Sequence, residues 1–103
     1  MVQHHPRGMV RELAEKKMIP AESLEELVGR AVRERRGKTG MTQVRLAELS
    51  GMTQAAVSRL EHGKCMPTFP LLERISTAFG SVLLVAVEPG RGVRVTFAEG
   101  DAV

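Results

Sequence analysis

The stretch TQVRLAELSGMTQAAVSRLEHG, residues 42–63, carries two short helical patterns on either side of a glycine. Thr42 and Thr53 each stand directly before a pattern, where a threonine hydroxyl can accept a hydrogen bond from the first turn of a helix. Gly51 and Gly63 stand directly after the patterns, where a left-handed backbone often ends a helix. The stretch therefore predicts two capped helices joined by a tight turn.

The apolar positions of these helices predict which sides face a core. The first helix is expected to run from residue 42 to about residue 50, and the second from residue 53 to about residue 62. Apolar residues three or four positions apart lie on one side of a helix. The residues expected to face inward are Leu46, Ala47 and Leu49 in the first helix and Ala56, Val57 and Leu60 in the second.

Two further helices are predicted before this pair. A short one over residues 9–18 is interrupted at Pro20, because the residue before a proline is driven out of the helical region. The next begins either at Pro20, which suits a first helical turn, or at Ser23, which can form a capping box with Glu26. It ends near residues 37–40, which hold two glycines.

The C-terminal part of the chain changes from a helical to a strand pattern. A fifth helix is expected from Thr68 until Gly80 stops it. Residues 82–87 then form a continuous apolar run, and residues 93–97 alternate between apolar and polar. Residues 89–92, PGRG, are a turn signal, so the two runs predict a β-hairpin with a five-residue loop.

These elements predict a mainly α fold of five helices followed by a C-terminal β-hairpin. We expect an N-terminal extension over residues 1–19, of which residues 1–8 lack regular structure. A helical domain is expected over residues 20–80, and a hairpin with a tail over residues 81–103.

The charges of the chain are unevenly distributed. The 103 residues carry a formal net charge of +3. Residues 30–64 hold eight basic and three acidic side chains, a balance of +5, so the rest of the chain is slightly acidic. Such a block favours a face directed at a polyanion, although an ordinary solvated face would have the same composition.

The composition argues against several other kinds of protein. Aromatic residues make up only 3% of the chain, too few for binding single-stranded nucleic acid by stacking. The single cysteine, Cys65, cannot form an internal disulfide and suits a reducing, cytoplasmic setting. The sequence has no metal-ligand cluster, no catalytic triad and no apolar run of membrane-spanning length. We therefore expect no enzymatic activity, no cofactor, no metal and no membrane contact.

A helix pair of this kind can place its second helix in the major groove of double-stranded DNA. Glutamine can pair with adenine, arginine with guanine, and alanine can touch a thymine methyl group. The candidate DNA-binding residues are Gln43, Gln54, Ala55, Ser58 and Arg59 on the two helices, with Lys38, Arg45 and Lys64 from the basic block. A helical hairpin with merely polar outer faces is the alternative, because two short helices around a glycine are common.

Residues 36–63 closely resemble the XRE-type, phage-repressor-like helix-turn-helix family. The positions that match the family pattern are Thr42, Gln43, Leu46, Ala47, Gly51, Met52, Thr53, Val57, Ser58, Glu61 and Gly63, followed by Pro67 and by LxxIxxAFG ending at Gly80. The resemblance covers about residues 24–80 and implies a five-helix, lambda-repressor-like DNA-binding domain. It implies that Gln43, Gln54, Ala55, Ser58 and Arg59 contact DNA.

The resemblance implies a different role for four other residues. Arg36 and Glu61 fall at positions that form an internal ion pair, which would be structural. Thr42 and Thr53 are expected first of all to cap helices, and Thr53 is also a candidate phosphate contact.

Useful specificity is expected to need two copies of the chain, because one good base contact discriminates by only about 1–3 kcal/mol. The run at residues 82–87 is apolar on both faces, so both faces or an edge need cover. We expect a homodimer through the C-terminal strands, bound to inverted half-sites of a DNA operator. The alternative is a hairpin that packs only on its own helices.

The helical domain followed directly by GSVLLVAVEP, residues 80–89, resembles the HigA- and HipB-type antitoxins. This resemblance implies a toxin protein as a second partner and repression of the chain's own operon. The N-terminal extension is then either a toxin-contacting element or a cover for the core. A stand-alone regulator without a toxin, and an interaction module that keeps the fold without reading DNA, stay open. In each case we expect a cytoplasmic protein, at the nucleoid when bound to DNA.

Overall fold

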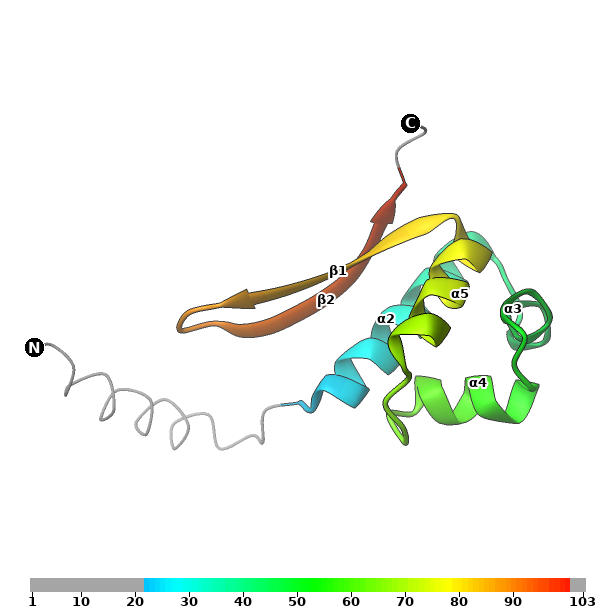
Figure 1. Ribbon diagram of the computed structural model, residues 1–103, viewed down its shortest axis with the longest axis horizontal. Coiled ribbons are helices and arrows are strands. Elements are labelled where there is room, and N and C mark those ends of the chain that lie inside the picture. The colour runs from blue at the N-terminus through cyan, green and yellow to red at the C-terminus, as the bar shows by residue number, and fades with distance from the viewer. Residues whose placement is uncertain (1–21, 101–103) are drawn as a thin grey trace, which may run out of the picture.

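The computed structural model describes residues 22–100. These residues form four helices and a two-stranded antiparallel hairpin (Figure 1). The elements are α2 (Leu24–Thr39), α3 (Gln43–Ser50), α4 (Gln54–Glu61), α5 (Phe69–Phe79), β1 (Ser81–Glu88) and β2 (Gly92–Glu99). Within this part of the chain the helices therefore number four instead of five, and the helix predicted over residues 9–18 lies outside the described residues. No helix over residues 22–100 is both long and apolar enough to cross a membrane.

Hydroxyl side chains begin all four helices. Ser23, Thr42, Thr53 and Thr68 each accept a hydrogen bond from the backbone N–H three residues further on. Such a cap is worth about 1 kcal/mol, because it satisfies an N–H that has no partner within the helix. Ser23 also forms the predicted capping box with Glu26, so α2 starts at the later of its two predicted positions.

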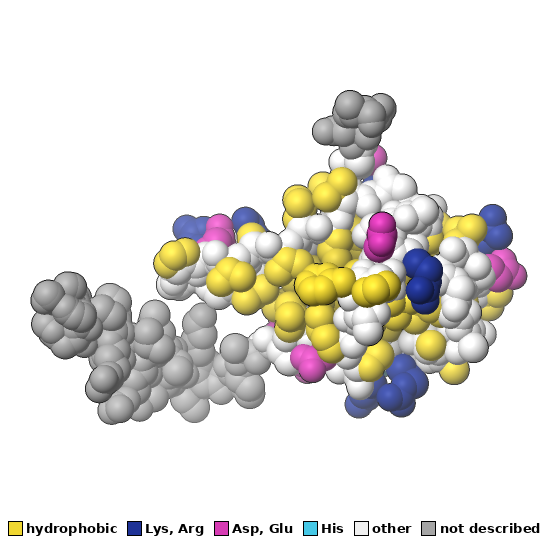
Figure 2. Space-filling view, in the orientation of Figure 1, with side chains coloured by type: hydrophobic (Ala, Val, Ile, Leu, Met, Phe, Trp, Pro, Cys, Tyr) yellow, Lys and Arg dark blue, Asp and Glu magenta, His cyan; other side chains and the backbone are white. Residues whose placement is uncertain are grey.

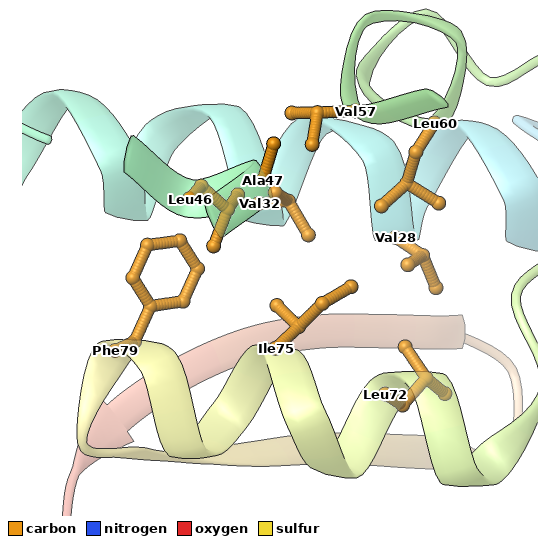
Figure 3. Packing of buried hydrophobic residues seen from close by; sticks show 9 residues of the cluster. All are labelled: Val28, Val32, Leu46, Ala47, Val57, Leu60, Leu72, Ile75 and Phe79. Carbon is orange, nitrogen blue, oxygen red and sulfur yellow. The ribbon is translucent and has the colours of Figure 1, made fainter. Parts of the chain in front are cut away.

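The core lies where the four helices meet. Its side chains point toward one another from all four helices (Figure 3). The hairpin packs on the same body, with β2 against α2 and β1 against α5. The buried cluster consists of Val28 and Val32 from α2, Leu46 and Ala47 from α3, Val57 and Leu60 from α4, and Leu72, Ile75 and Phe79 from α5.

The prediction that Leu49 faces inward is wrong. Its side chain is 43% exposed, whereas Ser50 is fully buried and its hydroxyl donates to the Leu46 carbonyl oxygen at 2.6 Å. With 100° between successive residues, Ser50 projects between Leu46 and Ala47, while Leu49 projects beyond the edge of that stripe. The buried stripe of α3 is therefore completed by a small polar residue that satisfies its own hydroxyl.

Gly29 permits the close approach of α2 to the end of α4. A Cβ atom built on this buried glycine would lie 2.3 Å from the carbonyl oxygen of Leu60 and 3.0 Å from that of Glu61. Real Cβ atoms essentially never come closer than 3.0 Å to another heavy atom. Glycine therefore fixes how closely the two helices pack, although it is a poor helix former.

The hairpin strands are longer, and their connection shorter, than the sequence predicts. Three residues, 89–91, join the strands in place of the predicted five-residue loop. The Arg91 N–H donates to the Glu88 carbonyl oxygen at 2.9 Å, and Gly90 takes a φ of +78°. This is a type II turn, which favours proline and glycine at its two central positions, so the strands can continue up to it.

One end of the hairpin packs on the helices and the other extends past them (Figure 1). Leu83 lies opposite Phe97 in the register, and the Phe97 ring meets the Phe79 ring edge to face at 5.2 Å. Further along the same face, Val85 is 52% exposed and Val87 is 75% exposed. The hydrophobic side chains of the hairpin form a nearly continuous apolar surface toward the body (Figure 2).

Candidate nucleic-acid interface

A three-residue turn, residues 51–53, joins α3 to α4. Gly51 has a φ of +74°, and its N–H donates to the Ala47 carbonyl oxygen, which caps the end of α3. The Met52 N–H bonds to the same carbonyl oxygen, and the Met52 side chain packs on the core. The turn is thereby fixed at its backbone and its side chain, which holds the start of α4 in a defined place relative to α3.

An ion pair between Arg36 and Glu61 joins α2 to α4. The Arg36 Nε lies 2.7 Å from Glu61 Oε2, and its Nη2 lies 3.0 Å from Oε1, so the pair is bidentate. The Glu61 side chain is only 1% exposed, and Arg36 also donates to the Met41 carbonyl oxygen. The hydrogen bonds that Arg36 donates to Glu61, together with the negative charge of that carboxylate, raise the pKa of Arg36 against the opposing effect of burial.

The Glu61 carboxylate is also the first member of a series of side-chain hydrogen bonds that leads to the start of α4. Gln43 donates from its side-chain nitrogen to Glu61 Oε1 at 3.0 Å. Gln54 in turn donates to the side-chain oxygen of Gln43 at 3.5 Å, the long limit for such a bond. The two glutamines therefore lie side by side at the starts of α3 and α4, and the buried ion pair orients the first of them.

The outward side of α4 carries the other candidate residues. Gln54, Ala55 and Arg59 are exposed and Ser58 is partly exposed, while Val57 and Leu60 are buried on the opposite side. Among residues 22–100, no hydrogen bond or ion pair engages the Arg59 guanidinium. This side of α4 therefore presents an amide, a methyl group, a hydroxyl and a free guanidinium over about two turns.

The three residues from the basic block occupy different places. Arg45 of α3 pairs with Glu48 at 3.2 Å, and both side chains are mostly exposed. Lys64 is exposed just after α4. Lys38 instead lines a cavity between α2 and β2, together with Thr96. Two residues along a helix correspond to about 200°, so Lys38 and Arg36 project from opposite sides of α2.

Two contacts of the site have no counterpart in the sequence-based predictions. The Arg74 Nε of α5 donates to the Ser50 carbonyl oxygen at 2.8 Å and so ties α5 to the turn before α4. The bond between Gln43 and Glu61 is the second. Each joins residues 18 or more positions apart, for which a local pattern gives no signal. Over the described residues, no group of three or more His, Cys, Asp or Glu side chains could hold a metal ion.

The comparisons with known proteins concern this same region. A family model described as helix-turn-helix matches residues 32–84, which run from within α2 into β1. The HTH-type transcriptional regulator PuuR of Escherichia coli is 36% identical over 52 residues, or 50% of the chain. The chain spans 28% of the length of this curated relative.

Solved structures show the same arrangement of helices. The clp gene regulator ClgR from C. glutamicum aligns with a TM-score of 0.56 and 34% identity, over 57% of this chain and 77% of that one. The restriction-modification controller protein C.Esp1396I, solved bound to a 25 base pair operator site, aligns with a TM-score of 0.53 and 28% identity. That alignment covers 56% of this chain and 76% of C.Esp1396I.

Proposed function

The chain belongs to the helix-turn-helix family of the XRE type, and on that premise we propose that it is a transcriptional regulator that binds double-stranded DNA sequence-specifically. In this proposal α4 lies in the major groove and α3 braces it. The structural similarity to C.Esp1396I, which was solved bound to an operator site, supports the proposal. The expected partner is a DNA operator, and repression is the expected outcome of binding.

One observation carries the proposal. The buried side of α4 is fixed by Leu60 in the core and by the bidentate pair of Glu61 with Arg36. On its outward side the Arg59 guanidinium makes no hydrogen bond or ion pair within residues 22–100, and Gln54 makes only a long bond to Gln43. Groups held rigidly in place lose little entropy on binding, so they can discriminate between bases.

The candidate residues divide by the DNA groups within their reach. We assign Gln54, Ala55, Ser58 and Arg59 to base edges, where glutamine suits adenine, alanine a thymine methyl group and arginine guanine. Gln43, Thr53, Arg45 and Lys64 are assigned to phosphates near the ends of α3 and α4. Lys38 was a sequence-based candidate, and its place beside β2 does not support a role in this interface.

Fluorescence anisotropy with DNA from upstream of the chain's own gene would test the proposal. We expect specific binding that weakens as salt concentration rises, because phosphate contacts release counterions. Arg59→Ala should weaken binding about tenfold or more and relax sequence preference, while the protein stays folded. Arg94→Ala is the matched control, because it removes another exposed arginine that lies away from α4, on the hairpin face opposite Val85 and Val87.

The control distinguishes sequence-specific contacts made by α4 from the general effect of removing one positive charge. If Arg59→Ala and Arg94→Ala weaken binding equally and without regard to sequence, α4 does not read DNA. The absence of any salt-sensitive, sequence-specific binding would contradict the proposal as a whole and favour a protein-interaction module that keeps the fold.

We further propose that the chain binds its operator as a homodimer joined through the hairpins. The exposed valines at the end of the hairpin support this, since an apolar two-stranded ribbon is marginal on its own in water. A two-fold dimer would present two α4 helices to half-sites about 34 Å apart. Sedimentation equilibrium measures the oligomeric state directly. A chain that stays monomeric both free and on its operator would contradict the proposed dimer.

The finer form of the proposal is an autoregulatory antitoxin, and the alternative is a stand-alone regulator with no toxin partner. The order of elements, a helix-turn-helix domain followed at once by an apolar hairpin, supports the antitoxin form. Co-expression with the product of the neighbouring gene distinguishes the two. A stable complex that relieves growth inhibition by that product supports an antitoxin, whereas DNA binding without such a complex supports the stand-alone regulator.

A further inference from the structure

A cavity of about 330 Å³ lies between α2 and β2, on the side of α2 away from Arg36. Its lining residues are Ala31, Glu34, Arg35, Lys38, Thr96 and Phe97. The apolar part of the lining is Ala31, which is buried, and Phe97, which packs on the core. Charged side chains of α2 border the opening. Four of the six lining residues are charged or polar, which suits a polar or charged ligand, and the volume falls at the small end of the range of small-molecule sites.

Arg35 is the unusual residue of this cavity. Its side chain is only 10% exposed, yet its ion-pair partner is Glu99, whose side chain is 88% exposed. A single bond of 3.2 Å joins the Arg35 Nη2 to the Glu99 Oε2. The Arg35 Nε is buried and, among the residues described, has no hydrogen-bond partner. A guanidinium has five N–H donors, and here only one of them bonds to another side chain of the described residues.

A comparison with Arg36 shows how incomplete this arrangement is. Arg36 is less buried, and still makes three hydrogen bonds, two of them to a carboxylate that is itself buried. An unsatisfied buried donor is costly, and native structures usually satisfy such groups. Glu99 does not satisfy Arg35 in this way, because it lies at the solvent-facing end of β2 and offers one oxygen.

The geometry points to a binding site for a small organic carboxylate at this position. The carboxylate would replace Glu99 on the Arg35 guanidinium, and its apolar body would rest on Phe97 and Ala31. The positive charge of Lys38 would favour the anion, whereas the negative charge of Glu34 would oppose it, which limits the site to ligands of low negative charge. The bidentate fit of a guanidinium to a carboxylate explains why this class is preferred over a neutral ligand.

Benzoate is a suitable probe, and benzamide is its neutral control of the same shape. Each is titrated into the full chain while the backbone amide signals of Ala31, Thr96 and Phe97 are followed by NMR. We expect benzoate to shift these signals in a saturable way and benzamide to bind about tenfold more weakly, because the charged hydrogen bonds are lost.

Two variants should change the affinity for benzoate in opposite directions. Arg35→Gln should weaken benzoate binding about tenfold or more. Glu99→Gln should strengthen it about two- to fivefold, because an exposed ion pair that competes with the ligand is removed. Glu99 is exposed, so its variant tests the proposal even if Arg35→Gln folds poorly.

Arg94→Gln serves as the matched control. Arg94 also pairs with a glutamate of the hairpin, at 3.3 Å, but lies near the turn and does not line the cavity. Its variant should bind benzoate like the unchanged protein. Equal binding of benzoate and benzamide, or no gain in Glu99→Gln, would overturn the proposal. Neither result would bear on DNA binding, since no operator is present in the experiment.

Discussion

Valines of the helical body and valines of the hairpin end in opposite surroundings. Val32 and Val57 are fully buried, whereas Val85 and Val87 are more than half exposed. Four helices surround a shared interior, so each can cover the apolar stripes of the others. A two-stranded sheet has two faces, and the helices here cover only one end of one face. Within residues 22–100 the helices therefore bury a shared core, while the hairpin presents apolar surface that a second molecule could cover.

The largest predicted effect is the loss of the ion pair inside the body. Arg36→Ala leaves the buried Glu61 carboxylate without its charged partner and should lower the free energy of unfolding by about 3–5 kcal/mol. Urea unfolding followed by circular dichroism measures the change. The double variant Arg36→Met with Glu61→Leu should recover most of this loss, because it removes both charges together. If Arg36→Ala alone changes stability by less than about 1 kcal/mol, then the pair contributes little to the body.

The next prediction concerns the buried stripe of α3. Leu46→Ala should cost about 2–5 kcal/mol, because Leu46 is fully buried and the substitution leaves a cavity. Leu49→Ala removes the same atoms from a half-exposed position three residues away and should change stability by about 0.5 kcal/mol or less. Thermal unfolding of the two variants side by side measures the difference. Equal losses would mean that Leu49 is covered in solution, for example by a part of the chain outside residues 22–100.

A third prediction tests the contact between α2 and α4. Gly29→Ala should cost about 1–3 kcal/mol, because the added Cβ would overlap the Leu60 carbonyl oxygen. Gly37→Ala, in the same helix, meets nothing within 4 Å and should stabilise the protein by about 0.5 kcal/mol through helix propensity. Chemical unfolding of the two variants measures both changes in the free energy of unfolding, the expected loss and the expected gain. A stabilising Gly29→Ala would contradict the close approach of the two helices.

The smallest effect on folding is predicted for the hairpin. Val87→Lys should change the free energy of unfolding of the isolated chain by about 0.5 kcal/mol or less. In the proposed dimer the same charge would enter an apolar interface, and association should weaken about tenfold or more. Sedimentation equilibrium measures association, and thermal unfolding measures the fold. Val44→Lys is the control, since it places the same charge on a half-exposed valine of the body and should leave association unchanged.

The sequence predicted the helices of the described region well because their signals are local. Each cap pairs a hydroxyl with an N–H three residues away, so Ser23, Thr42, Thr53 and Thr68 mark helix starts directly. The α3 stripe and the hairpin turn were less predictable. Ser50 replaces Leu49 in the core because its hydroxyl bonds back to its own helix, and periodicity of apolar residues cannot reveal such a polar residue.

The candidate site divides in a similar way. The outward residues of α4 follow from the register of a capped helix, so Gln54, Ala55 and Arg59 could be placed on one side from the sequence. The bond from Gln43 to Glu61 could not be placed, since 18 residues separate the partners. Gly29 gave a weaker signal: an isolated glycine within a helical pattern often has a packing reason, but the sequence does not name its neighbour.

The sequence by itself determined where the helices of the body begin and end and which sides of them are apolar. It did so because caps, turns and helical periodicity depend on residues within about one or two turns of each other. The family resemblance implied the pair of Arg36 with Glu61. Only the tertiary structure decided that Arg36 makes three hydrogen bonds while its neighbour Arg35 is buried beside a cavity with one exposed partner. Adjacent residues of a helix point in different directions, and what each one meets depends on elements far away in the chain.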